Sequence, residues 1–213
     1  MENKVKTHPI LFSTPMVQAI LENRKTQTRR VVKLPNYHPS MLEKQKNKLT
    51  IKDWKLYDGN QEVIGNMKCP YQIGDILWVR ETFHTIHDSE THDFLRYGYK
   101  ADNDYRGALW KPSLFMPKDA CRLFLKIKSI RVERLQDISE ADAIAEGVLR
   151  ISDYGSTGYL LYTEPNASHT DIDAVWSFES LWISINKEES WNSNPFVWVY
   201  EFERIEKPLN FGV

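Results

Sequence analysis

The densest group of reactive side chains in the sequence is the run RKTQTRR at residues 24–30. It places five hydrogen-bond donors suited to anions beside the hydroxyl groups of Thr26 and Thr28. A lysine close to a threonine can help that hydroxyl to attack, provided that burial or neighbouring cations lower the pKa of the amine. The same run can instead clamp a phosphate, or it can be a solvated basic turn. The residues alone leave these three interpretations open.

Two carboxylates stand where the pattern of the chain makes them unusual. Glu146 directly precedes Gly147, which we expect to end a helix, and the helix dipole disfavours a negative charge at that end. It can still be a solvated residue. Glu81 follows an apolar strand, and alternation places it on the face of Leu77 and Val79. We therefore expect Glu81 either to be paired inside the fold or to line a pocket.

The histidines and cysteines do not indicate a metal centre. His84, His87 and His92 lie close together in a polar segment, but their spacing matches no pattern that puts two ligands on one face. Cys69 and Cys121 are too few for a disulfide framework or a cysteine-based zinc site. We expect no metal and no cofactor, and a reducing, cytoplasmic setting.

The chain has seven tryptophans. Trp176, Trp182 and Trp198 lie on predicted apolar stripes, which indicates packing in the core. Trp78 and Trp110 are less clearly buried, and an accessible aromatic face can stack on an unpaired base.

The basic run must be positioned by a strand–helix–strand unit. After a short apolar segment, Thr14-Pro15 predicts the N-cap and first residue of a helix, and Asn23 suits the left-handed residue that ends it. A strand is expected over residues 26–32, so the run lies at a helix-to-strand turn.

The rest of the chain predicts strands with short helices between them. We expect strands at 76–83, within 84–107, at 121–135 and at 196–205, a hairpin turn at 58–60, and helices at 139–147 and 173–186. Ser139 begins the first of these helices, and Val175, Phe178, Trp182 and Ile185 form the apolar stripe of the second. The basic face of 121–135, which begins at Arg122, is usually solvated but can extend a groove for a polyanion.

Composition limits the class of protein. With 213 residues, 41% apolar and 27% charged, the chain is expected to be one globular domain without a membrane span or a secretory leader. The net charge of −1 hides an asymmetry, because residues 1–50 carry +7 and residues 132–213 carry −10. These parts can pair with each other or leave a basic face for a polyanion.

Four segments of the chain together resemble one known family. ILENRKTQTRR is similar to a glycine-lysine-threonine signature, with Asn23 where the pattern usually has glycine. GDILWVRETF, IRVERLQDISEADAIAEGV and a closing strand FVWVYEFERI follow in the family's order. The family is that of the ASCH domains, in the PUA-like superfamily, and the likeness is closest to the larger ASCH proteins of bacteriophages and prophages. It covers most of the chain apart from insertions near 36–66, 84–107 and 150–172.

The resemblance implies a fold and a site. The fold is a single α+β domain over residues 1–213, a PUA-like mixed β-barrel with short helices at the connections. A small bacterial ASCH protein hydrolyses the acetyl amide of N4-acetylcytidine with a lysine, a threonine and a glutamate and without a metal. By motif, these residues correspond to Lys25 as general base or charge partner, Thr28 as nucleophile and Glu146 as the group that orients and accepts protons. Ligand contacts are expected from Arg24, Thr26, Arg29, Arg30, Trp78, Arg80, Glu81, Trp110 and Arg122.

Three functions are compatible with these residues. The first is recognition of a modified or unpaired nucleobase, a nucleotide or single-stranded RNA in a basic cleft. The second is a metal-independent amidohydrolase acting on N4-acetylcytidine-like nucleosides, and other ASCH members resemble ribonucleases. The third is a phage interaction protein that acts through its inserted loops. Near-neutral net charge disfavours long duplex DNA as a partner.

Overall fold

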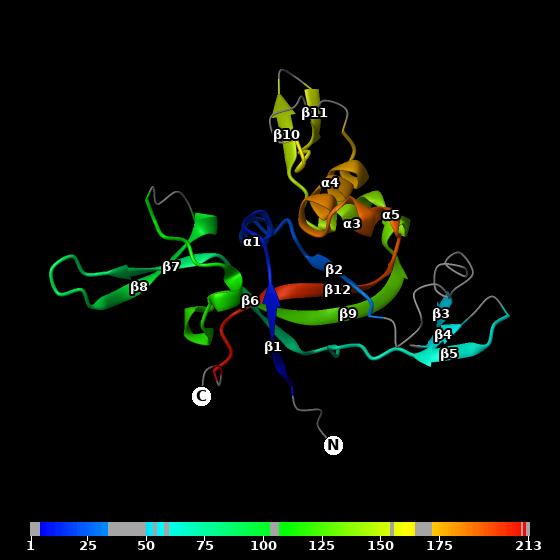
Figure 1. The fold of residues 1–213 in the computed structure, drawn as a ribbon, viewed down its shortest axis with the longest axis horizontal. Coiled ribbons are helices and arrows are strands. Elements are labelled where there is room, and N and C mark those ends of the chain that lie inside the picture. The colour runs from blue at the N-terminus through cyan, green and yellow to red at the C-terminus, as the bar shows by residue number, and fades with distance from the viewer. Residues whose placement is uncertain are drawn as a thin grey trace.

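The computed structural model describes residues 5–33, 50–52, 55–57, 60–102, 107–153, 156–164, 172–209 and 211, and has an α+β fold (Figure 1). Its strands are β1 (Thr7–Leu11), β2 (Gln27–Val31), β3 (Thr50–Lys52), β4 (Lys55–Tyr57), β5 (Val63–Asn66), β6 (Ile76–Arg80), β7 (Phe83–His87), β8 (Phe94–Tyr99), β9 (Phe124–Arg134), β10 (Arg150–Asp153), β11 (Ser156–Tyr159) and β12 (Phe196–Ile205). Its α-helices are α1 (Thr14–Leu21), α3 (Glu140–Ala145), α4 (Ala174–Asn186) and α5 (Glu188–Asn192). Single 3₁₀ turns lie at Lys100–Asp102, Ser113–Phe115, Lys118–Ala120 and Leu135–Asp137.

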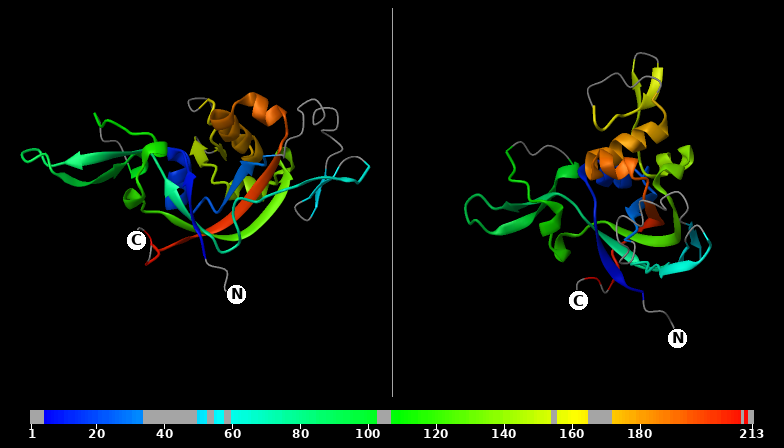
Figure 2. Two further views of the ribbon diagram at one scale, coloured as in Figure 1. Left: turned by 60° about the horizontal axis from the view of Figure 1, so that its bottom comes forward. Right: turned by 45° about the vertical axis from the view of Figure 1, so that its right-hand side comes forward.

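A five-stranded mixed sheet forms the centre of the fold. Its strand order is β1-β6-β9-β12-β2, with β1 parallel to β6 and every other neighbour antiparallel. The two long strands β9 and β12 curve together along their length (Figure 2). In the described part of the chain this sheet is open, so the α+β class is confirmed whereas the closed barrel stays a prediction.

Each segment predicted to be an insertion contains a small sheet of its own. Strands β3, β4 and β5 lie within 36–66, the β7–β8 hairpin starts just before 84–107, and the β10–β11 hairpin lies within 150–172. These sheets stand around the central one, as Figure 1 shows. Residues 36–49 and the hairpin residues 58–59 lie outside the described residues, although β4 and β5, which flank that turn, do pair antiparallel.

The strand–helix–strand unit is confirmed, with one correction at its start. Ser13, not Thr14, is the N-cap of α1, so Pro15 lies in the first turn rather than at its first residue. Asn23 has φ 58° and ends the helix in the left-handed conformation, as expected. The main-chain N–H groups of Arg24 and Lys25 then both donate to the carbonyl oxygen of Ala19, which directs the chain sharply into β2.

Three apolar clusters hold the sheet in place. The largest joins Leu125 and Ile127 of β9 to Trp198 and Tyr200 of β12, with Phe12 packed among them. The second lies between β12 and helices α3 and α4, and the third surrounds Phe124, Phe83 and Phe211. The predicted apolar face of β9 is therefore confirmed, and its opposite face is buried as well, at Phe124.

Two sequence-based expectations about apolar residues are wrong. The strand expected at 76–83 is divided into β6, which belongs to the central sheet, and β7, which pairs with β8, with Glu81 and Thr82 between them. Phe178 and Trp182 of the expected stripe are buried in α4, together with Leu181, but Trp176 is 52% exposed and Ile185 is 44% exposed. No described helix is long and apolar enough to cross a membrane.

Candidate functional site

Glu146 is positioned by the end of α3. Ser139 caps the start of this helix by accepting a hydrogen bond from the N–H of Asp142, and Gly147 follows the C-cap with φ 90°. A Cβ at Gly147 would lie 2.7 Å from the Cβ atoms of both Ala19 and Lys25, so glycine is needed for close approach as well as for conformation. The predicted helix ends are confirmed. The tight packing brings the end of α3 against the start of the basic run.

Lys25 and Glu146 form a buried ion pair. Lys25 Nζ donates to Glu146 Oε2 at 2.7 Å and to the Glu146 carbonyl oxygen at 2.9 Å, and its side chain is 0% exposed. The second carboxylate oxygen, Oε1, accepts from Arg29 at 3.0 Å. Burial lowers the pKa of Lys25, opposed by the charge of Glu146, which raises it. The unusual position of Glu146 is thus explained, because two cations replace the solvent that it lacks.

A shell of charged residues holds this pair in place. Arg29 also binds Glu133 and lies 3.5 Å from an oxygen of Asp142. Arg131 pairs with both of those carboxylates, at 3.1 and 2.8 Å, and with Glu201 at 2.7 Å. Because each carboxylate of this shell has an arginine partner, the orientation of Glu146 is fixed from several sides.

Thr28 contributes a buried hydroxyl without a partner. It lies opposite Tyr200 in the pairing of β2 with β12, and Arg30 lies opposite Trp198, so these four side chains share one face of the sheet. Thr28 is 1% exposed, and in the described part of the chain its Oγ1 has no hydrogen-bond partner. Buried hydroxyls are normally bonded, which makes this atom a candidate for contact with a ligand.

A cavity of about 430 Å³ opens on the same face of the sheet. Three cations and three aromatic rings line it, together with Val31 and Pro70: Arg30, Lys33, Lys68, Tyr71, Trp198 and Tyr200. Lys25 Nζ lies 5.6 Å and the Arg30 guanidinium 5.2 Å from the centre of the Phe12 ring, which places the buried ion pair next to this region. In the described residues, none of the three lining cations pairs with a carboxylate.

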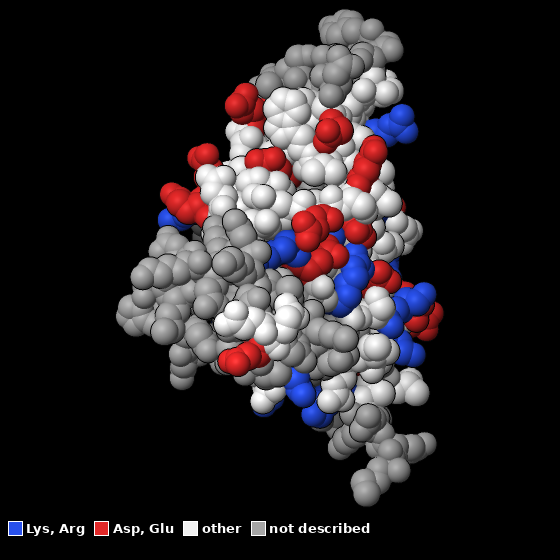
Figure 3. Space-filling view, turned by 90° about the vertical axis from the view of Figure 1, so that its right-hand side faces the viewer, with Lys and Arg blue, Asp and Glu red and all other residues white. Residues whose placement is uncertain are grey.

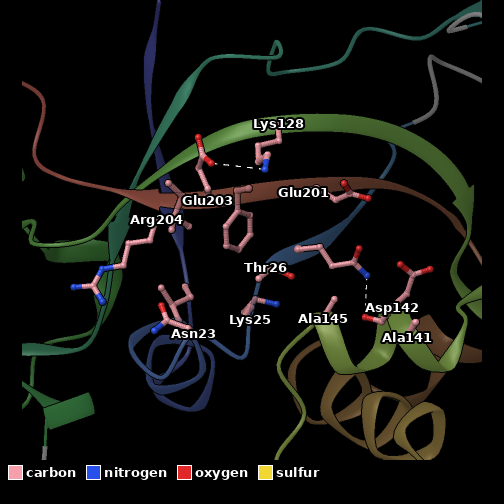
Figure 4. A pocket seen from close by; sticks show the side chains of 14 residues that line it. Asn23, Lys25, Thr26, Lys128, Ala141, Asp142, Ala145, Glu201, Glu203 and Arg204 are labelled. Atoms are coloured by element: carbon pink, nitrogen blue, oxygen red, sulfur yellow. Dashed lines mark hydrogen bonds and ion pairs between the residues drawn. The ribbon is translucent and has the colours of Figure 1, made fainter.

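A second cavity, of about 520 Å³, lies between α1, α3 and the end of β12. Lys25, Thr26 and Asp142 line it, as do residues of β12 after its pairing with β2 has ended, and Figure 4 shows these side chains around the opening. Acidic and basic groups are mixed here. Lys128 pairs with Glu203 at 3.7 Å across its rim.

The basic run is divided among different tasks. Arg24 pairs with Glu22 and donates to the carbonyl oxygen of Gly147, so it joins the two segments of the site. Thr26 is exposed, and its main chain links Ala145 to Phe202 through two hydrogen bonds. Arg29 is fully buried in the charged shell. Arg30 alone of these arginines lines the cavity beside Thr28.

The remaining predicted ligand residues belong to another part of the molecule. Glu81 is buried and paired with Arg122 at 2.8 Å, which confirms its expected pairing inside the fold. Burial raises the pKa of Glu81, and Arg122 opposes that shift. Arg80 donates to the carbonyl oxygens of Met116 and Leu114, Trp78 contacts Phe211, and Trp110 contacts His84. None of these residues lines either cavity.

The histidine-rich segment has structural contacts. His84 packs against Trp110 with ring centres 4.8 Å apart, and His87 Nδ1 lies 3.1 Å from the carbonyl oxygen of His92. Both cysteines are free thiols. Among the described residues, no three histidine, cysteine or carboxylate side chains are grouped to hold a metal ion.

Sequence reasoning missed most of the cavity lining. Trp198 was expected to pack in the core, which it does at 3% exposure, but its ring also faces the cavity. Its spacing of two residues from Tyr200 was the available signal, because it puts both rings on one face of a strand. Lys33, Lys68 and Tyr71 come from segments without a motif, and only the folded chain brings them together.

Acidic and basic side chains are interspersed on the outer surface. On the face shown in Figure 3, the described lysines and arginines stand beside aspartates and glutamates and do not form a broad surface of one charge. No protein-family model matches this sequence, and no curated protein or solved structure matches it. The resemblance to ASCH domains stays a prediction from motifs.

Proposed function

We propose that this protein recognises an unpaired or modified nucleobase, as part of a nucleotide or single-stranded RNA, in the cavity over the face of strands β2 and β12 in a PUA-like fold. The observation that carries the proposal is the lining of this cavity, which combines aromatic rings with cations that have no carboxylate partner among the described residues. Aromatic side chains stack on bases, and arginine and lysine bind the phosphates that accompany them.

The size and depth of the cavity support a small target. At about 430 Å³ it is near the lower end of the usual range for ligand pockets, about 300–1,000 Å³. The partnerless hydroxyl of Thr28 supplies a hydrogen-bonding group on the same face. The face shown in Figure 3, where the described charges of both signs are interspersed, offers no broad basic surface for a duplex.

Binding can be tested with nucleotides and a matched pair of variants. Titration of the protein with the four ribonucleotides and with pentamers of each base, followed by tryptophan fluorescence, should show saturable binding that Tyr71→Ala weakens. Trp110→Ala removes an aromatic residue outside the cavity and should leave affinity unchanged. Equal affinity for both variants and the wild type would place any binding elsewhere and reject the proposal.

A second function is favoured by a separate observation. Lys25, Glu146 and the hydroxyl of Thr28 are each buried, and burial lowers the pKa of Lys25. These groups are suited to deacylation of an N4-acetylcytidine-like amide without a metal. Thr28 Oγ1 would attack the acyl carbon while its proton passes to the Lys25–Glu146 pair. The carbon–nitrogen bond would then break, the amine would leave with that proton, and water would release the acyl group from Thr28 as the acid.

Incubation with N4-acetylcytidine and its deoxy form, followed by mass spectrometry, tests this activity. The wild type should release cytidine and acetate, and Thr28→Val should abolish release. Lys126→Gln changes an exposed lysine away from both cavities and should retain full activity. If no cytidine is released by folded wild type, the second function is rejected, while binding in the cavity is unaffected.

A further inference from the structure

We infer that the cavity over the face of β2 and β12 binds a nucleotide through a terminal phosphate group, so that the preferred ligand is a nucleoside monophosphate or a phosphorylated strand end and not a neutral nucleoside. This inference rests on the proposed recognition of a nucleobase and specifies the chemical class of the ligand. It comes from the uneven distribution of charge along the cavity.

Two of the three cations that line the cavity follow each other toward the C-terminal end of β2. Thr28 and Arg30 are two residues apart on one face of β2, about 7 Å along the strand, and Lys33 follows after the end of that strand. Lys68 also lines the cavity, from the segment between β5 and β6. The other direction along β2 leads to Thr28 and the Lys25–Glu146 pair, which is neutral overall. A ligand with a charged end and an uncharged aromatic end matches this polarity.

Arg30 is oriented before any ligand binds. One of its N–H groups donates to the carbonyl oxygen of Leu11 at 2.8 Å, and its guanidinium lies over the Phe12 ring. One main-chain bond leaves other donors of the guanidinium for a ligand, and a fixed guanidinium suits the two-pronged binding of a phosphate oxygen pair.

The lysines supply charge that the described protein does not neutralise. Lys33 and Lys68 are exposed and have no carboxylate partner in the described part of the chain, so three positive charges surround one cavity. A terminal phosphate carries a charge of about −1.5 to −2 at neutral pH, whereas a phosphodiester within a strand carries one. Three cations therefore attract a terminal phosphate more strongly than a phosphodiester.

The aromatic residues determine where the base would lie. Tyr71 and Tyr200 contact each other with ring centres 5.0 Å apart, and Trp198 lies across the pairing from Arg30. Trp198 and Tyr200 are 3% and 0% exposed, whereas Tyr71 is half-buried, so a nucleotide with its phosphate at Arg30 would lay its base against Tyr71.

The inference can be tested by comparing ligands with and without the phosphate. Isothermal titration calorimetry measures the gain in affinity that the phosphate group contributes. The wild type is titrated with each of the four nucleosides, with their 5′- and 3′-monophosphates, and with inorganic phosphate. We expect the preferred monophosphate to bind about 10- to 100-fold more tightly than its nucleoside, as charge-assisted hydrogen bonds would require. Raising the salt concentration should reduce that ratio.

Variants assign the advantage to the cations. The double variant Lys33→Gln/Lys68→Gln changes two exposed side chains and should fold normally. It should lose most of the difference in affinity between the monophosphate and its nucleoside. Arg30→Gln should lose it as well. The control Lys126→Gln should keep it.

The outcomes separate this inference from the proposed function. A nucleoside that binds as tightly as both of its monophosphates overturns the inference and leaves nucleobase recognition standing. A retained ratio in the double variant and in Arg30→Gln also overturns it. If no nucleoside or monophosphate binds, or if inorganic phosphate binds as tightly as any monophosphate, the proposed nucleobase recognition itself fails.

Discussion

Replacing Glu146 by glutamine tests how the buried charges are balanced. Glu146 is the only carboxylate among the described residues that pairs with Lys25, whereas Arg29 also has Glu133 and Asp142. The substitution therefore leaves the buried ammonium group of Lys25 without a carboxylate partner. Removing one partner of a buried ion pair costs about 3–5 kcal/mol of unfolding free energy. We expect a loss in that range at neutral pH.

The converse substitution should cost much less. Lys25→Met keeps the apolar stem and leaves the Glu146 carboxylate bound to Arg29, so no buried charge is stranded. Its cost should be about 1–2 kcal/mol, a common value for single substitutions. The asymmetry between the two variants is the quantity of interest, because a simple loss of one contact would make them equal.

Equilibrium unfolding in urea, followed by tryptophan fluorescence, measures both costs. The double variant Lys25→Met/Glu146→Gln should be more stable than Glu146→Gln alone, since it removes the stranded ammonium. Glu203→Gln breaks the exposed pair with Lys128 and should change stability by less than about 1 kcal/mol. If Lys25→Met costs as much as Glu146→Gln, the reasoning that Glu146 balances two cations is wrong.

Three further results are expected. Gly147→Ala should lower the unfolding free energy by at least about 2 kcal/mol, because it adds a clash with Ala19 to an unfavourable φ. Gly74→Ala has the same φ but open space around it and should lower the unfolding free energy by only about 1 kcal/mol, a difference that urea unfolding of both variants measures. Thr28→Val should leave the stability of the free protein unchanged or raise it by up to about 1 kcal/mol, since the lost hydroxyl has no partner, and a larger loss would reveal one. Burial lowers the pKa of Lys25 in the folded state, so between the folded pKa and the ordinary value of 10.5 the unfolded chain binds more protons at this residue. The unfolding free energy of the wild type relative to Lys25→Met should therefore rise as pH approaches 10.5. A fall would contradict the direction of the pKa shift.

Local signals predicted the ends of the site with good accuracy. Ser139 and Gly147 mark the two ends of a short helix, and Asn23 marks the end of another. These ends were predictable because capping depends on residues within one turn of each other. The alternation in β9 also gave its apolar face correctly. These features are set by neighbours in the chain, which a sequence displays directly.

The long-range features could not be read in this way. The strand expected at 76–83 is divided because β6 pairs with β1 and β9, whereas β7 pairs with β8 in a separate sheet. Likewise, the run at 24–30 shows five donors of similar type, but which of them is buried depends on where α3 and β9 pack. Arg29 and Arg30 are neighbours in sequence, yet the alternation of β2 places one in the charged shell and the other at the cavity.

Direct contacts hold the start of β2 against the end of α3, although a long stretch of chain connects these two segments. Lys25 and Glu146 are 121 residues apart in sequence, and the bonds from Thr26 to Ala145 and from Arg24 to Gly147 fasten the same two segments. The entropy of closing a flexible loop grows only with the logarithm of its length, by about 0.6 kcal/mol for each doubling. Residues added to or removed from the small peripheral sheets thus have little thermodynamic effect on the ion pair, so the fold can change its outline over evolutionary time while the geometry around Glu146 stays constant.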